Sequence, residues 1–322
     1  MSVSRLAVGA LILLIATALA LPAFANNYYL HIANYSLIFL LPALGLNLIF
    51  GYTGLLSLAQ GAFFGIGAYA GALVTLHFGW PFWLAFLFGG AFCALLSLLL
   101  AIPALRLRAY SFVMCTLSFV FIAETVAKNW VSLTRGDMAL TGIARPTLGL
   151  WSGGPPIVAL GAYYYLLLAL ALLGVLLFIW LVTSPAGRCL RAIRDDETLA
   201  ESQGIPVLAY KVASFALSAF YAGLGGAAYA SYETVVSPLI FQLYFTLLFL
   251  IIVFAGGAGT IGGVFVGTFL FVAIPEALRI TPELRLLLYG FVFIAFVFFL
   301  PDGIGPPLAR LAARLRRRGG SP

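Results

Sequence analysis

Residues 82–105 read FWLAFLFGGAFCALLSLLLAIPAL and end a run of 100 residues, from Leu6 to Leu105, that contains no Asp, Glu, Lys or Arg. One membrane-spanning helix needs about 20 mostly apolar residues, so this run has room for four crossings. Because lipid cannot satisfy backbone hydrogen bonds, such segments must be helices, and the absence of alternating polar and apolar residues excludes a β-barrel. The sequence therefore predicts an all-α, polytopic membrane protein.

The composition of the whole chain supports the same fold class. Hydrophobic residues make up 63% of the 322 and charged residues only 8%, against about 25% charged in soluble domains. Charges and Pro/Gly turns divide the chain into about ten transmembrane helices, within a range of eight to ten. We expect them near residues 6–25, 28–50, 55–77, 82–105, 109–127, 160–183, 212–232, 240–255, 260–275 and 286–300. Because glycines interrupt residues 234–275, this segment forms either two short spans or a re-entrant pair.

The basic residues predict the orientation, because Lys and Arg concentrate in cytoplasmic loops. With both termini in the cytoplasm, only five of the 17 Lys and Arg fall outside: Lys128, Arg135, Arg145, Arg279 and Arg285. This arrangement predicts one transmembrane permease domain over 1–308, with a cytoplasmic loop at 185–210 and an extracytoplasmic segment at 129–159. A basic cytoplasmic tail follows at 309–322. The net charge of +7 then needs no nucleic-acid partner to explain it.

The N-terminus allows a second interpretation. Arg5, the apolar residues up to Leu21 and the Ala23-Phe24-Ala25 sequence also fit a signal peptide with an A-x-A cleavage site. We favour a retained first span, and cleavage would leave the rest of the topology unchanged.

Few residues offer chemistry of their own. His31 and His77 are isolated, and Cys93, Cys115 and Cys189 lack metal or disulfide spacing, so the sequence predicts no metal site, no cofactor and no catalytic residues. Carboxylates are almost absent from the expected spans, whereas ion-coupled carriers commonly place them near the middle of the bilayer. The exception is Glu124, which can pair with Lys128 four residues later on one helix face.

Small residues recur four apart on several expected helices, which predicts closely packed helix backbones or, alternatively, close approach of a solute or helices that slide. The residues are Gly61 and Gly65, Gly67 and Gly71, Gly259, Gly263 and Gly267, and Ser214, Ser218, Ala222, Gly226 and Ala230. Uncharged polar groups also gather around the second and third spans, where Gly51-Tyr52-Thr53-Gly54 predicts a helix break. Candidates for a translocation path are Asn47, Ser57, Gln60, Gly65 and Tyr69. Hydrogen bonding between helices is an equally good explanation of these polar groups.

Residues 184–206 read SPAGRCLRAIRDDETLAESQGIP and form the most informative loop. Asp195 or Asp196 can cap a helix whose first turn contains Glu197, and Gly204 followed by Pro206 can end it after about two turns. A short capped helix on the cytoplasmic face suggests docking to a partner. A solvated loop is the alternative.

At this point a family resemblance becomes specific. GRCLRAIRDDETLAESQGIPVLAYK at 187–211 resembles the cytoplasmic loop of LivM-type permeases of branched-chain amino acid ABC transporters. GLLSLAQGAFFGIGAY at 54–69 and FAGGAGTIGG at 254–263 are similar to two further segments of that family. Ala59-Gln60 replaces the usual Gly-His, and the outer-loop TGGxxGLxGI appears as TRGDMALTGI at 134–143.

The resemblance implies an importer subunit of the bacterial cytoplasmic (inner) membrane, surrounded by lipid. It would work with a second, LivH-like permease, two cytoplasmic ATPases and an extracytoplasmic substrate-binding protein. Ala200, Glu201 and Gly204 match the family's ATPase-docking signature. The full set of expected coupling residues is Arg191, Arg194, Asp195, Asp196, Glu197, Ala200, Glu201 and Gly204. The chain has no GxxxxGK[ST] motif, so ATP would be bound by the partner ATPases and this chain would not be an enzyme. The expected substrates are leucine, isoleucine and valine, with urea, amides or aromatic acids as alternatives and an ion-coupled carrier as a less favoured mechanism.

Overall fold

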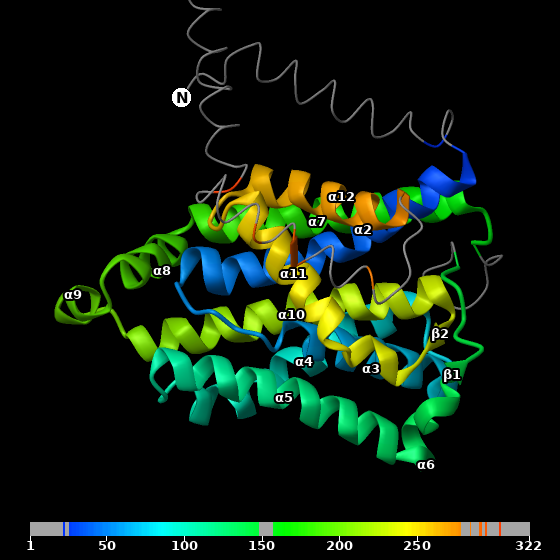
Figure 1. Cartoon of the computed structure of the whole chain (residues 1–322), viewed down its shortest axis with the longest axis horizontal. Coiled ribbons are helices and arrows are strands. Elements are labelled where there is room, and N and C mark those ends of the chain that lie inside the picture. Colours follow the sequence, from blue (N-terminus) through cyan, green and yellow to red (C-terminus); the bar gives the residue numbers. More distant parts are fainter. Residues whose placement is uncertain are drawn as a thin grey trace, which may run out of the picture.

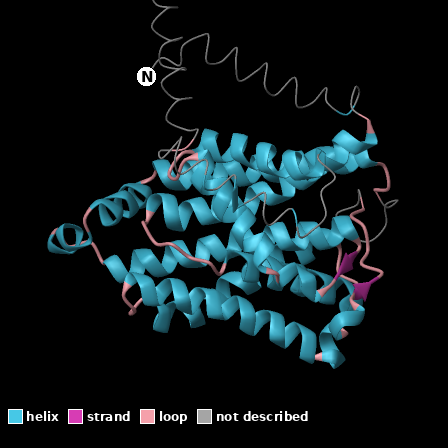
Figure 2. Cartoon of the chain, viewed as in Figure 1, coloured by secondary structure: helices cyan, strands magenta, loops and turns pink. Residues whose placement is uncertain are grey.

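The computed structural model describes residues 26–147 and 157–277, together with positions 22, 284, 290, 291, 294 and 303. Nearly all of the predicted first span at 6–25, most of the predicted last span at 286–300 and the whole tail at 309–322 lie outside these residues. The described part is almost entirely helical, with one small pair of strands (Figure 2).

Six of the described helices are long and apolar enough to cross a membrane, and they agree with the predicted spans from 28–50 to 212–232. They are α2 (Asn27–Leu46) continued by the π-helix η1 (Asn47–Tyr52), α3 (Gln60–Phe78), α4 (Phe82–Ala104), α5 (Ala109–Asn129), α7 (Leu160–Thr183) and α10 (Val207–Glu233). The all-α, multi-pass architecture is therefore confirmed.

The glycine-interrupted segment forms two shorter apolar helices, α11 (Leu243–Gly256) and α12 (Ile261–Ala277), which pack against each other. Helix α11 is 14 residues long, fewer than the roughly 20 that a full crossing needs. The turn between them contains Gly257 and Gly259, whose φ angles of 98° and 81° fall in the left-handed region that favours glycine. These glycines explain why the apolar segment is broken at this point.

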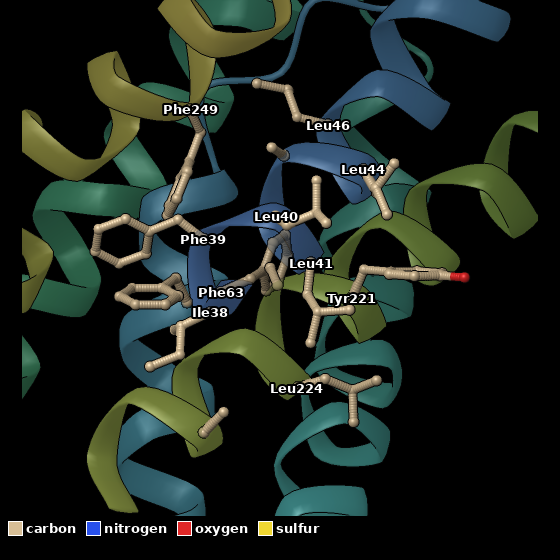
Figure 3. Close-up of a cluster of buried hydrophobic side chains, with 14 of the residues drawn as sticks. Ile38, Phe39, Leu40, Leu41, Leu44, Leu46, Phe63, Tyr221, Leu224 and Phe249 are labelled. Carbon is tan, nitrogen blue, oxygen red and sulfur yellow. The ribbon is translucent and has the colours of Figure 1, made fainter. Parts of the chain in front are cut away.

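Helix α10 lies at the centre of the bundle and packs most extensively against α4 and α3, and then against α2. Helix α2 is almost completely buried and also contacts α7, α11 and α12. Figure 3 shows the apolar side chains that meet around α2, including Phe39 and Leu41, with Phe63 of α3, Leu224 of α10 and Phe249 of α11. The predicted spans thus assemble around two buried helices.

Glycines let α3, α4 and α10 approach until their backbones touch. A methyl group at Gly223 of α10 would lie 2.5 Å from the carbonyl oxygen of Gly89 in α4, and one at Gly89 would lie 3.0 Å from the carbonyl oxygen of Gly67 in α3. Real Cβ contacts are rarely this short, so only glycine fits these positions. The small-residue spacing therefore produces close packing.

The remaining elements cap the two ends of the bundle (Figure 1). The short helices α8 (Pro185–Asp195) and α9 (Glu197–Ser202) connect α7 to α10 at one end. At the opposite end lie α6 (Val131–Thr134), η2 (Gly136–Met138), η3 (Pro238–Phe241) and an antiparallel pair of two-residue strands, β1 (Leu140–Thr141) and β2 (Val235–Val236). Arg106, Arg108 and Lys211 lie at the α8–α9 end, and Lys128, Arg135 and Arg145 at the other.

We predict that Gly226→Ala destabilises the bundle, because the new methyl group would clash with the Phe64 carbonyl oxygen and lie 2.8 Å from the Ala68 nitrogen. Overpacking costs about 1–3 kcal/mol, which should lower the midpoint of thermal unfolding by roughly 3–10 °C. Size-exclusion chromatography of heated, detergent-solubilised protein measures this midpoint. The matched control is Gly262→Ala on α12, where a methyl group meets nothing within 4 Å. Equal midpoints for the two variants would contradict the packing argument.

Candidate functional site

The connection between α7 and α10 begins with α8, an amphipathic helix that the sequence analysis missed. Ser184 caps it by accepting a hydrogen bond from the Gly187 amide at 3.4 Å, and Pro185 occupies its first position. A Ser-Pro pair is a recognised start signal, which could have revealed this helix. Leu190 and Ile193 are buried against the bundle, and Arg188, Arg191 and Arg194 are exposed.

The predicted short helix is present as α9, and Asp196 rather than Asp195 caps it. The Asp196 Oδ1 atom accepts a hydrogen bond from the Leu199 amide at 3.0 Å. At the C-terminus the Ile205 amide donates to the Ala200 carbonyl at 3.2 Å, and Gly204 has a φ of 81°. Gly204 therefore ends the helix in the left-handed conformation that glycine adopts most readily.

Two interactions fix α9 against α10. Ala200 packs with Ile193 of α8 and Val207 of α10 in a small buried cluster that is separate from the main core. The Lys211 ammonium of α10 forms an ion pair with Glu197 at 2.6 Å, and the Lys211 side chain is only 11% exposed. The α8–α9 segment is thus packed onto the bundle and is not a solvated loop.

The outward face of α9 is free among the described residues. Leu199 of α9 is 59% exposed, and Glu201 of α9 and Asp195, the last residue of α8, are also exposed. Because the sequence predicts a coupling role for this segment, we call these three residues the coupling face. An exposed leucine between carboxylates on a fixed segment is suited to docking against a protein with basic and apolar surface.

Arg194 of α8 lies next to two places where the regular α-helix is interrupted. They are the π-helix η1 and the turn between α11 and α12. Its Nη1 donates a hydrogen bond to the Gly51 carbonyl in η1, and the same atom would lie 2.9 Å from a methyl group at Gly259. Asn47 joins the same two segments, because its Oδ1 accepts from the Gly259 amide at 2.8 Å and its Nδ2 donates to the Thr260 carbonyl at 3.5 Å. We call Arg194, Asn47, Gly51, Gly259 and Thr260 the Arg194 junction.

Arg191 attaches the N-terminal part of α8 to the end of α7. Its Nη2 donates to the Val182 carbonyl at 3.2 Å and its Nε to the Gly187 carbonyl at 3.3 Å. Val182 is in the last turn of α7, where carbonyls lack intrahelical partners and a cation is favourable. The predicted coupling residues Arg191 and Arg194 therefore contact the bundle, whereas the acidic ones other than Glu197 face outward.

Two of the candidate path residues, Asn47 and Gln60, are buried and hydrogen-bonded between segments. The Gln60 Nε2 donates to the Pro42 carbonyl of α2 at 2.7 Å, and its Oε1 accepts from the Ser218 hydroxyl of α10 at 3.0 Å. Ser57 is also buried, and its Oγ accepts from the Ala59 amide at 3.3 Å. Backbone groups and the Ser218 hydroxyl satisfy these side chains inside the bundle, and their part in a translocation path stays a prediction.

Gly65 and Tyr69 lie together nearer the β1–β2 end. A methyl group at Gly65 would lie 2.5 Å from the ring of Phe241, and the Tyr69 ring stacks on the same Phe241 with centroids 5.8 Å apart. Tyr69 lines an apolar cavity of 500 Å³ between α3, α4 and α5, and its hydroxyl has no hydrogen-bond partner within the described part of the chain. The structure therefore separates the five candidates into two groups.

The predicted Glu124–Lys128 pair is present on α5, with the two charged atoms 2.7 Å apart. Within residues 26–147 and 157–277, no three His, Cys, Asp or Glu side chains gather in an arrangement that could hold a metal ion.

A comparison with known families decides the identity of this bundle. The sequence profile of the family described as the branched-chain amino acid transport system permease component matches residues 28–297. The chain belongs to this family. Members of the branched-chain amino acid permease family are transporter subunits, and this chain is accordingly a multi-pass inner-membrane permease that works with other subunits of an ABC transporter.

Individual relatives agree with the family assignment. The chain is 30% identical to the high-affinity branched-chain amino acid transport system permease protein LivM of Escherichia coli over 92% of this chain and 74% of that protein. LivM of Salmonella typhimurium matches with the same identity and the same coverage. A probable LivM of Methanocaldococcus jannaschii is 24% identical over 45% of this chain and 46% of that protein. No solved structure is significantly similar to the chain.

We predict that Asp196→Ala frays α9, because the Leu199 amide loses its side-chain acceptor. Loss of an N-cap costs about 1 kcal/mol, so the α9 amides should exchange with solvent several times faster in hydrogen–deuterium exchange. Asp196→Asn retains an acceptor and should exchange like the native protein. The control is Asp195→Ala, which removes an adjacent exposed carboxylate that does not cap α9. Faster exchange in both alanine variants would contradict the assignment of Asp196 as the cap.

Proposed function

We propose that this chain is a membrane-spanning permease of an ATP-driven importer for branched-chain and other hydrophobic amino acids. Membership in the family supports the substrate class, because the LivM relatives carry branched-chain amino acid transport in their names. In this proposal two ATPase subunits bind and hydrolyse ATP, a second LivH-like permease completes the membrane part, and an extracytoplasmic binding protein delivers the solute.

The observation that carries the ATP-driven mechanism is the α8–α9 segment. Its coupling face is exposed while its other side is attached to three helices, through Arg191 to α7, through Arg194 to η1 and through the Glu197–Lys211 ion pair to α10. A force applied to Leu199 and Glu201 would therefore move the ends of α7, α2 and α10. Such a movement can shift the bundle between inward-open and outward-open packings.

The scarcity of carboxylates inside the described bundle disfavours an ion-coupled carrier. Among the described residues of the six long helices, Glu124 is paired with Lys128 and Glu233 is the last residue of α10. Proton- and sodium-coupled carriers commonly use such groups near the middle of the bilayer. In proteoliposomes, leucine uptake that follows a proton or sodium gradient without any ATPase would contradict our proposal.

We predict that Glu201→Lys reduces ATP-dependent leucine uptake at least about tenfold, because it reverses a charge on the coupling face while leaving the packing of Ala200 intact. Uptake is measured in vesicles made from cells that produce the assembled transporter. Membrane insertion is checked by the amount of full-length protein. The matched control is Asp137→Lys, the same kind of charge reversal on an exposed residue at the opposite end of the bundle. Equal uptake by the two variants would remove α9 as the coupling element.

A second pair of variants tests the end of α9. Gly204 and Gly142 have nearly equal φ angles, 81° and 82°, and a methyl group meets nothing within 4 Å at either position. Gly→Ala therefore imposes the same backbone strain of about 1 kcal/mol at each. We expect Gly204→Ala to lower uptake several-fold and Gly142→Ala to leave it unchanged. If Gly142→Ala lowered uptake and Gly204→Ala did not, the geometry of α9 would not matter for transport.

A further inference from the structure

A polar cavity of 280 Å³ lies at the β1–β2 end of the bundle, opposite the coupling face. The first turns of α2 and α7 and the last turn of α10 surround it, together with residues just before α7. Its volume is close to the lower end of the roughly 300–1,000 Å³ that is typical of small-molecule sites. The cavity is therefore large enough for a compact solute and is distinct from the Arg194 junction.

Two opposite charges line this cavity without forming an ion pair. Arg145 and Glu233 both border it, and the only ion pairs among the described residues are Glu124–Lys128 and Glu197–Lys211. The Glu233 Oε1 accepts a hydrogen bond from the Tyr35 hydroxyl, which fixes the position of the carboxylate. The wall therefore presents one cation and one anion, and neither has a protein counter-ion in the described part of the chain. A ligand that has one positive and one negative group matches this pair.

A buried hydroxyl without a partner also belongs to this cavity. Tyr163 is only 4% exposed and lines the cavity, and its hydroxyl finds no hydrogen-bond partner among the described residues. Leaving a buried polar group unpaired is costly, so this hydroxyl is available to a polar atom of a ligand in the cavity. The neighbouring wall is ordered by a hydrogen bond of 2.5 Å between the His31 Nδ1 and the Tyr232 hydroxyl.

The rest of the wall is apolar. Ile157, which is 7% exposed, and Leu160 border the same space as the charged groups. A solute that fits all of these groups has one carboxylate, one ammonium group and a short apolar side chain. A purely cationic solute would leave Arg145 without a counter-charge, and a purely anionic one would leave Glu233 without one. A neutral solute would leave both without one.

We propose that this cavity binds an apolar amino acid in its zwitterionic form. Arg145 and the Tyr163 hydroxyl receive the carboxylate, Glu233 receives the ammonium group, and Ile157 with Leu160 contacts the side chain. Charge-assisted hydrogen bonds of this kind are the stronger class. The site would hold the solute at the entrance of the permease itself, independently of a binding protein. The choice of an apolar amino acid as ligand rests on the proposed function.

The test is binding of radiolabelled L-leucine to the full-length chain, purified from native membranes in mild detergent with the subunits that accompany it and without added binding protein. We expect Arg145→Gln and Glu233→Gln each to raise the Kd for leucine about tenfold or more, and Tyr163→Phe to raise it several-fold. The controls are Arg135→Gln, an exposed cation at the same end of the bundle, and Tyr164→Phe, a buried tyrosine that does not line the cavity. Both should bind like the native chain.

Two analogues give a measurement that a loss of folding would not mimic. Isopentylamine lacks the carboxylate and 4-methylpentanoate lacks the ammonium group. Native protein should prefer leucine to both, Arg145→Gln should lose the preference over isopentylamine, and Glu233→Gln should lose the preference over 4-methylpentanoate. Absence of leucine binding to the native chain, or an unchanged Kd in both charge variants, would overturn the assignment.

ATP-dependent leucine uptake by the native assembly is measured separately. It tests the proposed transport function and not the cavity. If the assembly imports leucine while the charge variants bind it normally, the transport proposal stands and the cavity assignment fails.

Discussion

The contact of helix backbones at Gly67, Gly89 and Gly223 is the constraint on which the rest of the bundle depends. In lipid, apolar side chains gain little by leaving one apolar surface for another, so helices associate chiefly through close packing and hydrogen bonds. Without side chains at these positions, α3, α4 and α10 touch along their backbones. Four further helices are placed relative to this group of three, because α2 packs against α10, and α7, α11 and α12 pack against α2.

This rigid group contrasts with the segment that contains the Arg194 junction. There the backbone departs from regular α-helix twice, in the π-helix Asn47–Tyr52 and in the turn between α11 and α12. Irregular backbone at membrane depth must be satisfied by protein groups, and Asn47 and Arg194 supply them. Because Arg194 belongs to α8, one of the two groups that stabilise the break is part of the segment proposed to receive the ATPase force. Single π-helical turns within α-helices are frequently found at functional sites.

Much of this arrangement could be predicted from the sequence, because lipid imposes simple rules on length and polarity. The six long helices, the helix break at Gly51–Gly54, the Glu124–Lys128 pair and the capped helix α9 all follow from local patterns. Helix α8 was missed because charge density suggested a loop, although Ser184-Pro185 was a start signal. The pairing of β1 with β2 could not be predicted, since it joins two-residue strands from distant parts of the chain. The cavity between Arg145 and Glu233 was equally invisible, because the residues around it come from four separate parts of the chain.

The two ends of the molecule are joined by the same three helices. Helix α2 contributes His31 and Tyr35 at the cavity end and continues through η1 to Gly51 at the Arg194 junction. Helix α10 runs from Lys211, which is paired with Glu197, to Glu233 at the cavity. Helix α7 runs from Tyr163 to Val182, which accepts a hydrogen bond from Arg191. Each of these three helices contacts the α8–α9 segment at one end and lines the cavity at the other. A displacement of that segment would therefore act on all three helices. In the proposed transport cycle, a movement of these helices would change the spacing of Tyr163 and Glu233, which lie on α7 and α10. Such a change would alter the affinity for a zwitterion without any contact between the ATPase and the solute.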